Sequence, residues 1–62
     1  MIKSVIKSDK GIVLVFDEND EQLPEYQGPY ADVKEKILRD APPEASFGEM
    51  VTALRPVTRE KW

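Results

Sequence analysis

The residues best suited to chemistry are the carboxylates of one short acidic stretch, Asp17-Glu18-Asn19-Asp20-Glu21. Its side-chain oxygens at positions 17, 19 and 21 resemble the start of a calcium-binding loop. Such a loop needs glycine at its sixth position and a bidentate glutamate at its twelfth, where this chain has Gln22 and Gly28. We therefore expect a solvated turn that holds no metal and no cofactor.

Nothing else in the sequence is diagnostic of an enzyme. The chain has no cysteine and no histidine, so disulfides, thiol chemistry and the usual zinc ligands are excluded. It also lacks a Ser-x-x-Lys motif, a glycine-rich phosphate loop and paired carboxylates at a catalytic spacing. Burial beside Phe16 could activate Asp17, but a turn residue in water is the plainer interpretation. We expect no catalytic activity.

Three lysines near the start of the chain form a second candidate site. Lys3, Lys7 and Lys10 lie in residues 1–11, where Asp9 is the one acidic residue. They could contact an anion or nucleic acid from the first strand. No aromatic residue lies between them, and the whole chain has a net charge of −3, which disfavours a polyanionic partner. Weak nucleic-acid or anion binding is therefore the alternative function rather than the expected one.

The apolar run 12–16 is the stretch around which the other elements must be arranged. It predicts a strand that is buried on both faces, because successive side chains of a strand point to opposite sides. Segments 2–7 and 22–26 predict its neighbours, which gives a three-stranded antiparallel meander with 12–16 in the centre. Gly11 should adopt a positive φ in the first turn. The two faces of the central strand are lined by Ile12, Leu14 and Phe16 and by Val13 and Val15.

A helix is predicted over residues 29–41. Pro29 suits a first helical position, and Pro42 and Pro43 prevent continuation beyond the end. An apolar stripe of helical period follows, which we expect to pack on the face of Ile12, Leu14 and Phe16. This stripe consists of Tyr30, Val33, Ile37, Leu38 and Ala41.

Residues 46–55 allow two interpretations. Apolar residues at helical spacing, together with Ser46 and Glu49 as a capping box, favour a second short helix. Gly48, Val51 and Thr52 are poor helix formers, so a strand paired with the open edge of residues 2–7 is the alternative. Trp62 could either fold onto the core or stay exposed.

These elements predict an α+β fold in one small domain, residues 1–62. No segment approaches the ~20 apolar residues of a membrane span, and the start of the chain lacks a secretory signal, so we expect a cytoplasmic protein. The expected function is a non-enzymatic protein-interaction or accessory module. A partner or a second copy would cover the valine face, unless residues 44–62 cover it internally. The candidate interaction residues are Val5, Val13, Val15, Tyr26 and Trp62.

Overall fold

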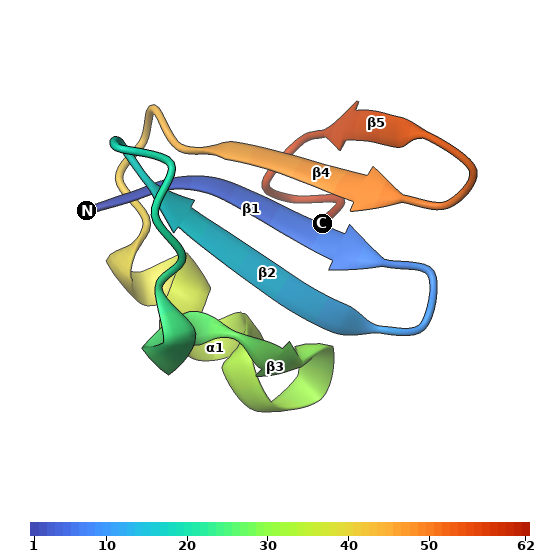
Figure 1. Ribbon diagram of the computed structural model, residues 1–62, viewed down its shortest axis with the longest axis horizontal. Coiled ribbons are helices and arrows are strands. Elements are labelled where there is room, and N and C mark those ends of the chain that lie inside the picture. The colour runs from blue at the N-terminus through green and yellow to red at the C-terminus, as the bar shows by residue number, and fades with distance from the viewer.

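The main element of the computed structural model, which describes residues 1–62, is a five-stranded mixed sheet (Figure 1). Its spatial order is β3-β2-β1-β4-β5, with β1 and β4 parallel and the other neighbours antiparallel. The strands are β1 (Ile2–Ser8), β2 (Ile12–Asp17), β3 (Gly28–Pro29), β4 (Ser46–Met50) and β5 (Leu54–Val57). The α+β class is confirmed, whereas the three-stranded meander with two helices is wrong.

The single α-helix, α1 (Tyr30–Asp40), matches the helix predicted over 29–41 to within a residue at each end. It begins directly after Pro29, and the proline pair that follows it prevents another turn. Val33 and Ile37 are the buried residues of the helix, and Tyr30 and Leu38 pack against the same core. No helix of the structure is long and apolar enough to cross a lipid bilayer.

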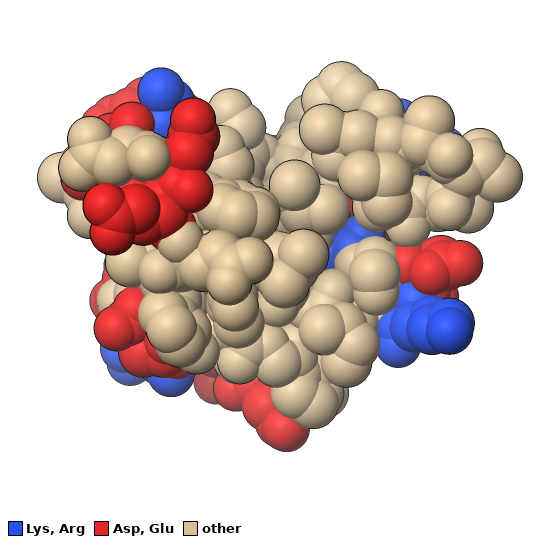
Figure 2. Space-filling model, in the orientation of Figure 1, with Lys and Arg blue, Asp and Glu red and all other residues tan.

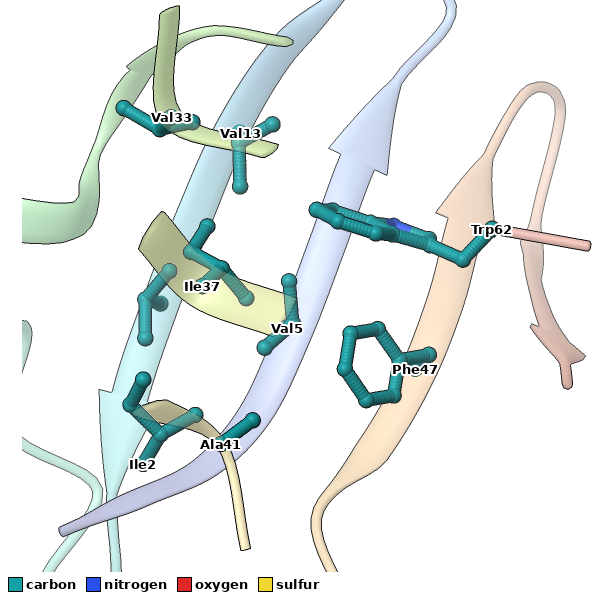
Figure 3. Packing of buried hydrophobic residues seen from close by; sticks show 9 residues of the cluster. Ile2, Val5, Val13, Val33, Ile37, Ala41, Phe47 and Trp62 are labelled. Carbon is teal, nitrogen blue, oxygen red and sulfur yellow. The ribbon is translucent and has the colours of Figure 1, made fainter. Parts of the chain in front are cut away.

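The helix covers the face of β2 opposite to the one predicted. Val13 lies next to Val33 of the helix in Figure 3. Val13 and Val15 are fully buried, whereas Ile12 and Leu14 on the other face are 45% and 38% exposed. Both faces of this strand are apolar, so the strand pattern alone does not select between them. The prediction that α1 packs on Ile12, Leu14 and Phe16 is therefore wrong.

Residues 46–55 form β4, a turn and the start of β5, not a second helix. The alternative of a strand beside residues 2–7 is the correct one, because β4 pairs with β1 in parallel from Ser4 and Ser46 to Ser8 and Met50. This pairing satisfies an edge of β1 that would otherwise expose unpaired amides and carbonyls. It also makes β1 the middle strand, with β2 next to it.

The predicted strand over 22–26 is reduced to a bridge and a turn. Gln22 pairs with Phe16 in an isolated bridge, and Pro24–Tyr26 then form a 3-10 helix, η1. Pro24 lacks the amide that a continuing ladder requires. The outer edge of β2 is instead satisfied by the Gln27 side chain, which accepts a hydrogen bond from the Val15 amide at 3.1 Å. Gly11, in the turn between β1 and β2, has a φ angle of +81°, and the predicted positive φ is confirmed.

The core lies between the sheet and α1 and is extended by the end of the chain. An irregularity in β1 between Ile2 and Ser4 places Ile2 on the same face as Val5, although strict alternation would separate them. Trp62 folds back and is 3% exposed, which settles the alternative left open by the sequence. The buried core residues are Ile2, Val5, Val13, Val15, Val33, Ile37, Ala41, Phe47 and Trp62.

Candidate interaction surface

One face of the sheet has no other element packed on it. We call it the open face, and the face toward α1 the covered face. The strand registers show which side chains belong to the open face, because residues directly opposite one another on paired strands point to the same side of the sheet. The open face consists of Ser4, Ile6, Ser8, Ile12, Leu14, Phe16, Ser46, Gly48, Met50, Leu54 and Pro56.

The open face carries no charged side chain and exposes several large apolar ones. Leu54, Ile12, Met50 and Leu14 are between 55% and 38% exposed. In Figure 1, α1 lies below the β2 edge of the sheet, and the same view in Figure 2 shows uncharged side chains over most of the strands and acidic groups near the turn after β2. A lysine or arginine group is visible between the uncharged side chains near the end of β1, and other charged groups lie at the outline. Contiguous exposed apolar patches of this kind mark interaction sites on proteins more often than scattered apolar residues do.

A hollow of about 250 Å³ lies on the open face between β1, β4 and β5. Small residues create it, because Ser4 and Ser46 are short and Gly48 has no side chain. Its rim and floor are formed by larger residues, among them Ile6, Leu54 and Pro56. Beside the hollow, Leu14 and Phe16 of β2 lie opposite Ile6 and Ser4, which line it, and Ile12 and Leu14 are 45% and 38% exposed. We call the row of Ile12, Leu14 and Phe16 the ridge.

The residues predicted as an interaction surface lie elsewhere. Val5, Val13, Val15 and Trp62 are each at most 3% exposed and belong to the core, so they offer no surface to a partner. Residues 44–62 help to cover the valine face, because Phe47 and Trp62 belong to the same core cluster as the valines. This was one of the two alternatives predicted from the sequence. Tyr26 is half-buried, and its hydroxyl donates a hydrogen bond to Asp40 at 2.6 Å.

The sequence carried the signal for the open face, since Ile12, Leu14 and Phe16 alternate with the valines along the same strand. The valines were chosen as surface residues because the helix was assigned to the wrong side of that strand. The apolar residues of β4 and β5 were also read as a helical stripe, which hid Met50 and Leu54 as members of a sheet face.

The three lysines do not form one site. The Lys7 ammonium is 3.5 Å from a Glu49 carboxylate oxygen, lies 4.1 Å from the centroid of the Tyr30 ring and donates a hydrogen bond to the Trp62 carbonyl. Lys3 is exposed at the start of β1, and Lys10 is exposed in the turn that follows β1. Lys3 and Lys10 are thus separated by the length of β1, and Lys7, between them in sequence, is already paired with Glu49.

The acidic stretch caps its own turn. An Asp17 carboxylate oxygen accepts hydrogen bonds from the amides of Asn19 at 2.8 Å and Glu21 at 3.0 Å. Asp20 adopts φ of +63°, a left-handed conformation that aspartate tolerates better than most residues. No group of three carboxylates in the structure is placed to hold a metal ion.

Hydrogen bonds shift pKa values in two polar clusters, one around Glu49 on the covered face and one around Asp40 at the end of α1. A hydrogen bond from Arg55 lowers the pKa of Glu49, and Lys7 adds to this effect. Hydrogen bonds from Arg39 and then Tyr26 lower the pKa of Asp40, and the same bond to Asp40 raises the pKa of the Tyr26 phenol. Both clusters lie away from the open face, so they form no site on that surface.

Comparison of the chain with protein-family models, with curated proteins and with solved structures finds no match.

Proposed function

We propose that this chain is a non-enzymatic protein-interaction module that binds a protein partner through the open face. The observation that supports this proposal most is the difference in solvent exposure between the two sides of β2. Val13 and Val15 are fully buried, yet Ile12 and Leu14, in the same strand, keep 45% and 38% of their surface exposed. An apolar sheet face is normally packed against a second layer, and this chain supplies only one.

The chemistry of the open face favours a protein over nucleic acid. Nucleic-acid affinity depends on lysine and arginine side chains that neutralise phosphates. The open face has none, and an acidic turn follows β2 at one end of it. Apolar and uncharged residues at the centre with charges at the rim are instead the usual anatomy of a protein interface.

Photo-crosslinking in living cells that express the chain tests the proposal. A photoreactive residue replaces Leu14 on the open face or, as the matched control, Ala31, which is exposed on α1. We expect protein adducts of defined mass from position 14 and none from position 31. The absence of adducts at position 14, or the same adducts from both positions, would contradict the proposal.

A further inference from the structure

We infer that the occupant of the open face is a second copy of this chain, and that the two copies form a two-fold symmetric sandwich with their sheets face to face. This inference rests on the proposed function, since it names the partner for the same surface. Two packed sheets with α1 of each copy on the outside would give each sheet the second layer that it lacks.

The shape of the open face is complementary to itself. The ridge of β2, formed by Ile12, Leu14 and Phe16, lies beside the hollow that Ser4, Ser46 and Gly48 create. A two-fold axis parallel to the strands and between these features would place the ridge of each copy in the hollow of the other. Such an isologous contact uses the same patch on both copies and closes after two.

The size of the open face agrees with a small homodimer. The whole molecule measures 27 × 22 × 21 Å. Contact over one entire side would cover roughly 500 Å² on each copy, about 1,000 Å² in total, which is in the range of weak specific interfaces. The uncharged centre of the face lets a second copy approach without burying an unpaired charge.

The charges at the rim of the open face predict how the dimer depends on salt concentration. The axis along the strands brings the acidic turns of the two copies, residues 17–21, to the same end of the dimer. Each chain also carries a net charge of −3. Salt screens such repulsion, so the dimer should become tighter as the salt concentration rises. Binding to a polyanion would show the opposite dependence.

Sedimentation equilibrium of the full chain, from micromolar to millimolar concentration, tests this arrangement. We expect a monomer–dimer equilibrium that shifts toward dimer with added salt. In Leu14→Glu the dimer dissociation constant should rise by at least about 30-fold, as for a central interface residue. Circular dichroism should show that this variant stays folded.

A second variant separates ridge-in-hollow packing from general stickiness. Ser46→Leu adds apolar surface to the open face but fills the hollow that should receive the partner's ridge. We expect a weaker dimer, with a dissociation constant raised about 10-fold or more. A tighter Ser46→Leu dimer would overturn the proposed packing, and so would a dimer unaffected by Leu14→Glu or loosened by salt.

A wild-type chain that is monomeric at all concentrations would overturn the dimer. The proposed function has a different readout, because crosslinking at position 14 to proteins other than this chain would then still support it. A monomeric chain without such adducts would end both proposals.

Discussion

At the scale of single residues, Trp62 joins the last turn of the chain to the core. Its ring meets the Tyr30 ring edge to face, with 5.1 Å between centroids. The centroid of the Phe47 ring, which lies beside Trp62 in Figure 3, is 5.0 Å away. The Trp62 carbonyl accepts hydrogen bonds from the Tyr30 hydroxyl at 2.5 Å and from Lys7 at 3.3 Å. Arg59 adds a second tie, since its guanidinium donates hydrogen bonds to the carbonyls of Ala41 and Pro42. The segment after β5 is therefore part of the core.

Replacing Trp62 with alanine should unfold much of the population. Truncating a buried aromatic residue costs about 3–5 kcal/mol, which is comparable to the whole stability of a domain this small. Trp62→Phe should cost clearly less, because it keeps an aromatic ring and removes an indole N–H that is buried without a partner. Urea unfolding of the two variants checks this order. Equal stability of Trp62→Ala and the wild type would contradict the role of Trp62 in the core.

Acid should remove the contribution of the Glu49 cluster. Glu49 is hydrogen-bonded to Arg55 at 2.8 Å, and this bond holds its pKa below the ordinary value of 4.5. A lowered pKa in the folded state means that stability is gained above pH ~4.5 and lost as the pH falls through the folded value. The wild type should therefore lose its advantage over Glu49→Gln on acidification below this pH.

The free energy of unfolding of both proteins, measured by urea denaturation between pH 7 and pH 3, tests this dependence. Glu44→Gln is the control, because Glu44 is exposed and makes no salt bridge. A constant difference between the wild type and Glu49→Gln across this range would show that the ion pairs of Glu49 do not stabilise the fold.

At the scale of elements, the close approach of β4 and β5 depends on Gly48. A Cβ atom there would lie 3.1 Å from the Leu54 side chain and 3.3 Å from the Arg55 backbone carbonyl oxygen. Since a backbone atom cannot move without its strand, Gly48→Ala should displace β5 and lower the free energy of unfolding by about 1–3 kcal/mol. Ser46→Ala, on the same face of the same strand, should be nearly neutral. Urea unfolding compares the two, and equal effects would contradict the tight packing of β5.

The sequence predicts the elements whose signals are local. The proline and apolar pattern located α1, and Gly11 located the hairpin between β1 and β2. Residues 46–55 were misassigned because a parallel partner strand 42 positions away, with Ser4 opposite Ser46, decides their state, and helical spacing with a capping box is compatible with either outcome. The side of β2 that α1 covers was undetermined for a similar reason, since Val13 and Leu14 belong to equally apolar faces. The candidate surface was therefore placed on the wrong side of the correct strand.

At the scale of the whole molecule, the fold has two layers, the sheet and α1, and no element packs on the open face of the sheet. The helix and the last turn complete the covered face, while the ridge and the hollow of the open face remain in contact with solvent. For a chain this short, a partner on that face would add apolar burial to a core of only nine buried residues. The proposed function and the dimer both depend on this assignment of the two faces.

Unfolding of the adjacent variants Val13→Glu and Leu14→Glu, followed by circular dichroism and urea denaturation, tests that assignment most directly. The two substitutions introduce the same charge one residue apart, on opposite sides of β2. We predict that Val13→Glu is unfolded, because it buries an unpaired carboxylate in the core, and that Leu14→Glu keeps the fold, because its side chain remains in solvent. A folded Val13→Glu together with an unfolded Leu14→Glu would show that α1 covers the other face, and the proposed interaction surface would be contradicted.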